Sequence, residues 1–322
     1  MKIAVTGANG FVGSNFANHF HHQGHEVVAI VRPKSPADLL NPAIAIRRTD
    51  YQNGLESALE GVEILIHNAG AIRARSFAQM VAANVETTRR VMEAFNRSET
   101  AKRLVYISSQ AASRPSRANE EVTESEPSAP VDWYGRSKLL AERIIRAECS
   151  REWVVVRPVS VYGPGEKDFL QVFKAVKAGI SFRIGRREQY LNLIHIDELC
   201  EFTELCCSHP GAVGEVFFAS NGKTYTHHEF MAACAKALGR KKTLDIAIPV
   251  PLAVLGFHAG ELFETLTGKV TLLNKQKMKE IIGVNWVCSI AKARSILGWD
   301  PHPDLEAQLG KTFAWYREHG WL

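Results

Sequence analysis

Short apolar runs alternate with longer amphipathic stretches along the first half of the chain. The apolar runs, rich in β-branched residues, cover residues 2–5, 26–31, 43–48, 62–67, 103–108 and 153–158. Apolar residues at helical spacing between these runs predict helices that begin after residue 10 and at residue 55, and that cover residues 80–95 and 133–147. This alternation is typical of an α/β fold in which a doubly wound parallel sheet carries helices on both faces.

The pattern becomes less regular after about residue 168. A return to the sheet is predicted near LNLIHI (191–196) and GEVFFAS (214–220), and an amphipathic helix over 305–316 closes the chain. We therefore predict two domains. The first comprises residues 1–168, with 192–220 returning to it, and a smaller, mostly helical domain comprises residues 169–191 and 221–322.

Composition and charge exclude several classes of protein. With 322 residues, 46% hydrophobic and 23% charged, the chain can bury one large core or two unequal ones. The formal charge of +5 comes from scattered residues without a basic block, so we expect no nucleic-acid partner. Six cysteines without CxxC spacing and an N-terminus without a secretory signal favour a reducing, cytoplasmic location.

Two further stretches invite other functions. The string HFHHQGH (19–25) suggests a metal site, but it ends the first predicted helix on the side away from the ligand edge of the sheet, so we expect no metal. The most apolar stretch, residues 246–257, is too short and too often broken by proline to span a bilayer, and we expect no stable membrane insertion. The overlapping stretch AIPVPLAVLGFHAGELF (247–263) could lie on a membrane surface or cover a substrate pocket, and the second interpretation is the simpler.

The first motif with chemical meaning is TGANGFVGSN (6–15), which follows the first strand and opens the first helix. Three glycines at this spacing let the backbone turn tightly, approach a pyrophosphate and pack the helix on the sheet, while the helix N-terminus attracts the phosphates. The motif predicts a Rossmann-type site for NAD or NADP. Its candidate cofactor-binding residues are Gly7, Asn9, Gly10, Phe11, Val12 and Gly13.

The end of the second strand bears on the choice of dinucleotide. NAD sites usually place Asp or Glu there to bind the ribose 2′-hydroxyl, whereas NADP sites offer Arg to the 2′-phosphate. Here Val31 takes that position and Arg32 follows it. Arg32 is therefore a candidate cofactor-binding residue, and NADP is the preferred cofactor. NAD stays open, because Arg32 could also stack on adenine or be a solvated loop residue.

A second motif, DWYGRSK (132–138), sets Tyr134 and Lys138 one helical turn apart. The fifth strand delivers Ser108 and Ser109 to the sheet edge where that helix begins. Lowering the pKa of a phenol from about 10 to near neutrality takes about 4 kcal/mol. An ammonium ~4 Å away supplies about that amount at an effective dielectric constant of ~20. We therefore predict that Lys138 makes Tyr134 acidic enough to exchange a proton.

Several motifs occur together in a fixed order along the chain. They are TGANGFVGS (6–14), Asp50, HNAG (67–70), Asn84, ISS (107–109), YGRSK (134–138), RPVSVYGPG (157–165), LIHIDEL (193–199) and ILGWDPHPDLE (296–306). In this combination the chain resembles an extended short-chain dehydrogenase/reductase of the NAD-dependent epimerase/dehydratase family. The resemblance spans nearly the whole sequence.

The resemblance implies roles for the matching residues. Tyr134 is the general acid/base on the substrate oxygen, Ser109 donates a hydrogen bond to that oxygen, and Lys138 holds the nicotinamide ribose. Ser108 is the alternative serine. Asn84 either contacts the site or is purely structural, linking helix to sheet. The other implied cofactor contacts are Asp50 and Tyr51 near adenine, Asn68, Ala69 and Gly70 along the dinucleotide, and Pro158, Val159 and Val161 beside the nicotinamide amide.

The family also implies a homodimer, because helices over 78–97 and 133–147 correspond to the pair that forms its four-helix dimer interface. One departure from the family affects the substrate side. The VYG expected after the serine pair is replaced by the polar loop SRPSRANEE (113–121).

Two other departures narrow the substrate. Sugar-nucleotide 4,6-dehydratases follow their active hydroxyl residue with an Asp-Glu pair, whereas Gln110 and Ala111 follow Ser109 here. Many nucleotide-sugar epimerases clamp the diphosphate with an arginine four residues before the histidine of the IHxxD segment, where this chain has Leu191. An aliphatic side chain cannot neutralise a diphosphate. Three arginines nearby in the sequence could take its place: Arg183, Arg186 and Arg187.

What remains resembles the branch with 3β-hydroxysteroid dehydrogenases and dihydroflavonol reductases, which oxidise or reduce a secondary alcohol or ketone on a largely apolar small molecule. We predict an NAD(P)-dependent oxidoreductase of that kind. Candidate pocket residues, each of which taken singly fits a core better, are Trp133, Phe169, Phe173, Phe182, Phe257, Phe263 and Trp286. The alternatives are a nucleotide-sugar epimerase and a non-catalytic dinucleotide-binding sensor, although the intact Ser109, Tyr134 and Lys138 argue against the sensor.

Overall fold

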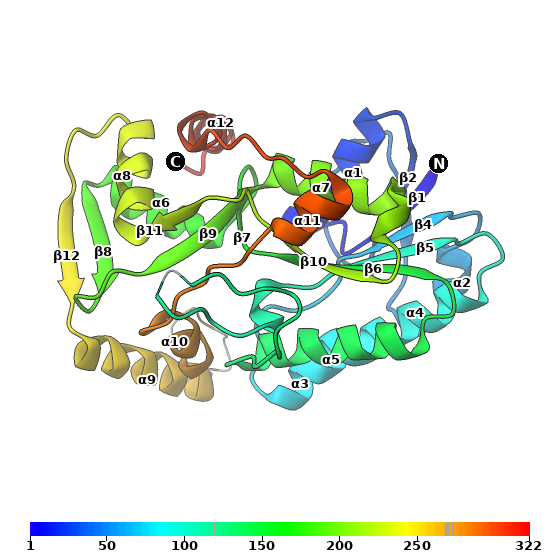
Figure 1. Ribbon diagram of the computed structural model, residues 1–322, viewed down its shortest axis with the longest axis horizontal. Helices are drawn as coiled ribbons and strands as arrows, with labels where there is room; N and C mark the ends of the chain where they lie inside the picture. The colour runs from blue at the N-terminus through cyan, green and yellow to red at the C-terminus, as the bar shows by residue number, and fades with distance from the viewer. Residues whose placement is uncertain (119, 268–270, 272–273) are drawn as a thin grey trace.

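The computed structural model describes residues 1–118, 120–267, 271 and 274–322, so Asn119 of the polar loop lies outside it. Seven strands form its central sheet: β1 (Lys2–Thr6), β2 (Glu26–Val31), β3 (Ala45–Arg48), β4 (Ile64–His67), β5 (Arg103–Ile107), β6 (Glu152–Pro158) and β10 (Glu215–Ala219). Their order is β10-β6-β5-β4-β1-β2-β3, and every neighbouring pair is parallel (Figure 1). The predicted doubly wound α/β sheet is confirmed.

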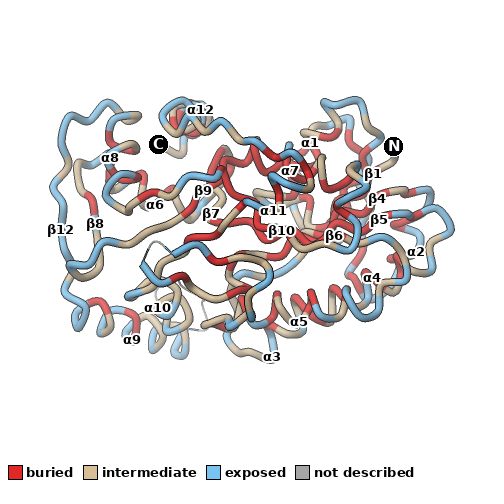
Figure 2. Tube along the Cα trace, in the orientation of Figure 1, coloured by how far each residue is buried: buried red, intermediate tan, exposed pale blue. Residues whose placement is uncertain are grey.

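Helices cover both faces of this sheet, which explains why its strands are almost continuously apolar. One face packs against α1 (Phe11–His22), α7 (Ile196–Ser208) and α11 (Ala291–Leu297). The other packs against α2 (Leu55–Ala58), α4 (Thr87–Arg97) and α5 (Trp133–Glu148). Figure 2 shows that the buried stretches gather between these layers. The carboxyl ends of the strands are thereby held in one rigid edge.

The helix predicted over residues 80–95 is divided in the structure. It starts as α3 (Phe77–Val81), passes through a π-helical turn at Ala82–Glu86 and continues as α4. The π-helical turn carries the buried side chain of Asn84, which forms hydrogen bonds to segments outside its own helix.

A second region lies beyond the carboxyl edge of the sheet. Its elements are β7 (Ser160–Tyr162), α6 (Asp168–Lys177), β8 (Ile180–Ile184), β9 (Tyr190–His195), β11 (Thr224–Thr226), α8 (His227–Ala237), β12 (Leu244–Ile248), α9 (Val250–Thr267), α10 (Lys275–Ile281) and α12 (Leu305–Glu318). Phe173, Phe230 and Phe313 form the centre of its own small core. α9 and α10 extend below the rest of this region in Figure 1.

The predicted return to the main sheet near LNLIHI and GEVFFAS is made by the second segment alone. GEVFFAS returns as β10, beside β6. LNLIHI does not, because β9 pairs with β7 and β11 in a separate three-stranded sheet. Both sides of β6 are already taken by β5 and β10, so β7, which follows β6 without an intervening helix, offers the free edge that β9 joins.

Candidate active site

The glycine turn between β1 and α1 is shaped to hold a phosphate. Gly7 has a φ of +66°, and a Cβ on Gly13 would lie 2.3 Å from the Gly7 carbonyl oxygen, so α1 packs directly on the turn. A Cβ on Gly10 would meet only that same oxygen, at 3.5 Å. Among the residues that the structure describes, no side chain caps α1, and the first turn of this helix contains no acidic residue. The free N–H groups there fit the pyrophosphate of a nicotinamide dinucleotide.

Tyr51 supports this turn from beneath. The N–H of Gly7 donates to the Tyr51 hydroxyl at 3.1 Å, and the buried ring leaves little surface for the predicted adenine contact. Asp50 is exposed instead. Its carboxylate accepts hydrogen bonds from the N–H groups of Asn53 and Gln52 at 2.9 and 2.8 Å, which lower the pKa of Asp50.

The loop after β2 presents Arg32 to solvent. Arg48 holds this loop from below, since its Nη1 donates to the carbonyl oxygens of Arg32, Pro33 and Ser35 at 3.1, 3.0 and 3.0 Å. Val31, at the position where an NAD site usually has an acid, is buried. The site therefore offers a cation, and no carboxylate, at the end of β2.

Tyr134 lies in the first turn of α5, and the start of this helix is fixed by two contacts. The N–H of Gly135 donates to Asp132 Oδ1 at 2.7 Å. A Cβ on Gly135 would lie 2.0 Å from the carbonyl oxygen of Ala111, so this glycine lets α5 approach the short 3-10 turn Gln110–Ala112. Ser109 begins that turn, and its hydroxyl accepts a hydrogen bond from the N–H of Ala111 at 3.1 Å. The same hydroxyl is close enough to the Tyr134 phenol to lower the pKa of that phenol.

Ser108 points into the protein. Its hydroxyl donates to Glu142 Oε1 at 2.5 Å, and Arg157 Nε and Nη2 bind the same carboxylate at 2.9 and 2.6 Å. The side chains of Ser108, Glu142 and Arg157 are all buried, and the carboxylate of Glu142 is paired with the guanidinium of Arg157. This leaves Ser109, the serine preferred from the sequence, as the one that contacts Tyr134.

Lys138 is buried one turn along the same helix. Its Nζ donates to the Ile107 carbonyl oxygen at 2.6 Å and lies 4.3 Å from the centre of the Tyr106 ring. Burial lowers the pKa of Lys138 to about 7, although the Glu142 carboxylate acts in the opposite direction. The ammonium is therefore partly deprotonated at neutral pH.

Tyr134 itself is not acidified in this structure. Burial raises the pKa of Tyr134 to about 12, and the charges of Asp132 and Glu280 raise it further, whereas the hydrogen bond with Ser109 lowers it. The prediction that Lys138 makes this phenol acidic is wrong here, because it left out burial and the two neighbouring carboxyl groups. At neutral pH the phenol keeps its proton.

Asn84 ties the loop after β4 to α5. Its Oδ1 accepts from the N–H of Ala71 at 2.6 Å, and its Nδ2 donates to the Ala71 carbonyl oxygen at 2.9 Å and to Ser137 Oγ at 2.8 Å. A Cβ on Gly70 would lie 2.9 Å from the same Oδ1. Of the two roles open from the sequence, the structure shows the structural one, with a loop rather than the sheet as the partner of α5.

The remaining predicted cofactor contacts lie along the same edge. The N–H groups of Asn68 and Ala69 both donate to Thr6 Oγ1 at 3.1 Å, which holds the loop after β4 beside the glycine turn. The other three, at the passage from β6 into β7, are Pro158, Val159 and Val161.

A cavity of about 170 Å³ opens beside Tyr134. Its apolar lining includes Ile72, Met80 and Trp133, and its ionisable lining comprises Arg73, Asp132, Asp168, Lys277 and Glu280 together with Tyr134. Arg73 forms an ion pair with Asp168, and Lys277 Nζ lies 2.5 Å from Glu280 Oε2. Each of these two cations is thus paired with a carboxylate.

Most of this polar lining was missed from the sequence. Asp132 had a local signal, because a residue of its type directly before an amphipathic helix is a typical N-cap. Arg73 and Glu280 had none, since only the tertiary fold brings α10 and the loop after β4 together. Among the described lining residues, Trp133 is the only member of the aromatic set predicted for the pocket. Phe169 and Phe173 stack in the small core instead, with ring centroids 5.8 Å apart.

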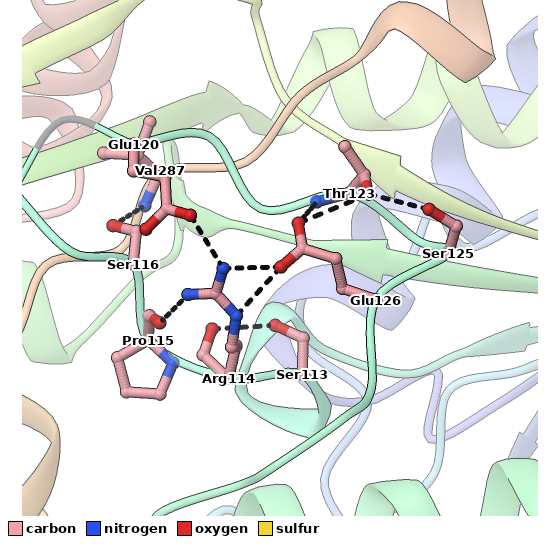
Figure 3. Close-up of polar contacts among 9 residues, drawn as sticks. All are labelled: Ser113, Arg114, Pro115, Ser116, Glu120, Thr123, Ser125, Glu126 and Val287. Atoms are coloured by element: carbon pink, nitrogen blue, oxygen red, sulfur yellow. Dashed lines mark hydrogen bonds and ion pairs between the residues drawn. The ribbon is translucent and has the colours of Figure 1, made fainter.

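The polar loop that replaces the expected VYG is cross-braced (Figure 3). The Arg114 guanidinium lies between two carboxylates, with Nη2 2.5 Å from Glu126 Oε2 and 3.1 Å from Glu120 Oε1. The hydroxyl of Ser116 accepts from the N–H of Val287 at 3.1 Å. The loop is therefore fastened to the segment that follows α10. This segment belongs to the second region, beyond the carboxyl edge of the sheet, which we call the substrate-side region.

Comparisons with known proteins agree with this geometry. A model of the NAD dependent epimerase/dehydratase family matches residues 3–218. The chain is 26% identical to a ceramide reductase of Caulobacter vibrioides (99% of this chain, 96% of the relative). It is 28% identical to a UDP-glucose 4-epimerase of Vibrio cholerae (97% of this chain, 94% of the relative). In fold it resembles the crystal structure of a dTDP-glucose 4,6-dehydratase from Streptomyces venezuelae with NAD bound, with a TM-score of 0.79 at 20% identity (100% of this chain, 98% of the other).

Proposed function

This chain belongs to the NAD-dependent epimerase/dehydratase family, as its motifs indicated, and on that premise we propose that it is an NAD(P)-dependent oxidoreductase that reduces a ketone on a largely apolar small molecule. A nicotinamide dinucleotide held by the glycine turn at Gly7, Gly10 and Gly13 would supply the hydride for the carbonyl carbon. Tyr134 gives its phenolic proton to the carbonyl oxygen, and Ser109 orients that oxygen by hydrogen bonding. The raised pKa of Tyr134, about 12, favours this direction, because a protonated phenol is a proton donor at neutral pH.

The observation that carries the proposal is the charge of the cavity beside Tyr134. Its lining holds two cations, Arg73 and Lys277, and both are paired with carboxylates. A third carboxyl group, that of Asp132, belongs to the same lining. A diphosphate would have to displace these carboxylates to reach a cation, and its charge would meet theirs. A neutral ketone experiences no such electrostatic repulsion, and the apolar skeleton of its molecule can contact Trp133 and Met80.

The arginines that could have replaced Leu191 support the same conclusion. Arg183 is paired with Asp245 at 2.7 Å, between β8 and β12. Neither it nor Arg186 or Arg187 lines the described part of the cavity beside Tyr134. A nucleotide-sugar epimerase is the second candidate, favoured by the likeness to the epimerase of Vibrio cholerae. That enzyme class would use the same oxidation as a transient first step.

We further propose that NADP is preferred over NAD, because Arg32 is exposed at the end of β2 and Val31 offers no carboxylate to a ribose 2′-hydroxyl.

We also propose a homodimer built on α4 and α5, which pack side by side on one face of the sheet. Light scattering coupled to size exclusion tests the assembly, and a monomeric mass would refute it.

The function is tested with the purified chain and a panel of ketones. Oxidation of NADPH is followed with 3-ketosteroids, long-chain lipid ketones and flavonoid ketones, and UDP-glucose is titrated by calorimetry in parallel. Turnover of one apolar ketone that is lost in Tyr134→Phe supports the proposal. Tight UDP-glucose binding with interconversion of the sugar would establish the epimerase instead, and tight NADPH binding with the same response in wild type and Tyr134→Phe would indicate a sensor.

A further inference from the structure

The polarity of α9 is inverted relative to an ordinary surface helix. Its large apolar side chains face solvent, with Leu255, Leu262 and Leu266 exposed at 64%, 59% and 76%. At about 100° per residue, these leucines share one third of the helix circumference with Leu252 and Phe263, which are also exposed. Only Ala253 and Phe257 are buried, and Figure 2 shows most of α9 as exposed. A helix that packs only on its own protein turns its apolar face inward.

The charged residues of α9 face the protein. Glu261 forms an ion pair with Lys275 at 2.6 Å, and Glu264 accepts hydrogen bonds from Asn274 Nδ2 at 3.1 Å and from the hydroxyl of Thr271 at 3.1 Å. These contacts fasten α9 to the segment that leads into α10. The outward apolar face is therefore held in place by polar contacts behind it, which indicates an apolar partner in front of it.

The sequence suggested that this segment covers the substrate pocket, but α9 does not cover the cavity. None of the described residues of α9 lines the cavity. Thr271 and Gln276, which follow α9 in the chain, do line it. The apolar face lies outside the cavity, on the side of α9 away from the contacts of Glu261 and Glu264 with the segment that leads into α10. Among the described helices, none is both long and apolar enough to cross a membrane.

Basic residues flank the apolar face at both ends. Arg186 and Arg187 are exposed beside the start of α9, where a Cβ on Gly185 would lie 3.2 Å from Val250 Cγ2. Lys279 is exposed beyond its end, as is Lys275, whose charge is shared with Glu261. α9 itself contains no lysine or arginine. An apolar stripe between cationic ends is complementary to a bilayer surface that contains anionic lipids.

A second copy of the chain is a poorer partner. In a two-fold symmetric contact through α9, each copy would bring its own basic flanks toward those of the other, and like charges would meet at the rim. Anionic head groups neutralise the same flanks, and the acyl region accepts the leucines.

We propose that α9 docks this protein on anionic membrane surfaces, with its leucine face in the head-group and acyl boundary. The inference rests on the proposed function in one respect, because an apolar ketone resides in such a bilayer. Docking through α9 would bring the cavity wall formed by Thr271, Gln276 and α10 close to the membrane. The cavity beside Tyr134 would then be held near the bilayer that contains the substrate.

Vesicle flotation tests the docking without any substrate or cofactor. Wild type is mixed with vesicles of phosphatidylcholine alone and of phosphatidylcholine with phosphatidylglycerol. We expect flotation with the mixed vesicles and little with the neutral ones. The double variant Leu255→Gln/Leu262→Gln should lose binding by about tenfold or more. Arg186→Gln/Arg187→Gln should weaken binding to the mixed vesicles, so that the preference for them decreases.

The matched control is Val213→Gln, which removes an apolar side chain of 38% exposure from the turn before β10, far from α9, and should float as wild type does. Unfolding midpoints of all variants are compared, and they should agree because each replaced side chain is exposed. A wild type that floats with neither vesicle, or a leucine variant that floats as well as wild type, refutes the docking. A dimer that the leucine variant abolishes, without vesicle binding, would identify a second copy as the partner. None of these outcomes depends on ketone turnover, so the two proposals fail separately.

Discussion

The carboxyl groups of Asp132 and Glu280 share a hydrogen bond that joins the N-terminus of α5 to α10. Burial, the hydrogen bond and the charge of Glu280 raise the pKa of Asp132 to about 8. Burial acts to raise the pKa of Glu280 as well, but the hydrogen bond from Asp132 and the charge of Lys277 lower it overall. At neutral pH the pair therefore holds one proton, on Asp132. The same residue caps the helix that carries Tyr134, so the proton links the substrate-side region to the catalytic helix.

The raised pKa of Asp132 predicts that the free energy of unfolding decreases as the pH rises toward and through about 8. The pKa of Asp132 is higher in the folded chain than in the unfolded chain, so the folded state binds more protons between the two values. Its contribution is complete below about pH 4 and is lost as the pH rises through about 8. We expect the unfolding midpoint to drop by about 2–4 °C between about pH 7 and about pH 9. Glu280→Gln removes the second charge and should flatten this drop, and an unchanged slope in that variant would contradict the shared proton.

The two adjacent serines should give different phenotypes. Ser109→Ala removes the hydroxyl beside Tyr134 and should lower kcat for the identified ketone by about tenfold to a hundredfold. The same hydroxyl caps the turn Gln110–Ala112, so a loss of about 1 kcal/mol of stability is expected as well. Ser108→Ala removes a donor from the buried Glu142 carboxylate and should cost about 1–3 kcal/mol of stability. Steady-state kinetics and denaturant unfolding of both variants decide the assignment. A larger kcat loss in Ser108→Ala would reverse it.

The protonated phenol predicts different pH profiles for the two directions of the reaction. Because burial raises the pKa of Tyr134 to about 12, the proton needed for reduction is present throughout the neutral range. The reduction rate should be nearly flat between about pH 6 and about pH 9, whereas oxidation, which needs the phenolate, should rise about tenfold per pH unit. Initial rates in both directions measure this. An oxidation rate that levels off near neutrality would show that the bound cofactor acidifies the phenol.

Alanine substitutions at two glycines of the turn between β1 and α1 should distinguish an effect on dinucleotide affinity from an effect on the stability of the fold. Gly10→Ala adds a Cβ that meets only the Gly7 carbonyl oxygen at 3.5 Å, so the fold should persist while the approach of a pyrophosphate is hindered. Gly13→Ala places a Cβ 2.3 Å from that oxygen and should lower both stability and dinucleotide affinity. Calorimetric titration with NADPH and thermal unfolding test the pair. Gly310, whose Cβ would meet nothing within 4 Å in α12, is the control, and Gly310→Ala should keep full affinity.

Arg32 should decide between the two dinucleotides. Arg32→Ala removes the exposed cation at the end of β2 and should weaken NADP binding by about tenfold or more, with little effect on NAD. Dissociation constants for both dinucleotides, measured with wild type and variant, give the ratio. Equal losses for NADP and NAD would leave the preference without a basis.

Much of the cofactor side could be predicted from the sequence because its signals are local. The apolar runs of β1 and β2, the glycines between β1 and α1, and the spacing of Tyr134 and Lys138 each lie within a short stretch whose backbone geometry follows from nearest neighbours. Buried parallel strands need continuous apolar runs, and a phosphate turn needs glycine, whatever the rest of the chain does. The sequence alone therefore determined the doubly wound sheet, the dinucleotide turn and the residues at its edge.

Only the tertiary structure decided the chemistry of those residues. It turned Ser108 toward Glu142 and Ser109 toward Tyr134, and it brought Glu280 from α10 beside Asp132. A pKa depends on burial and on charges that are distant in the sequence. The acidic phenol expected from Lys138 therefore does not occur, because partial burial and the carboxyl groups of Asp132 and Glu280 raise the pKa of Tyr134. The outward leucines of α9 have the same origin, because the direction in which a helix faces is set by what it packs against and not by its own periodicity.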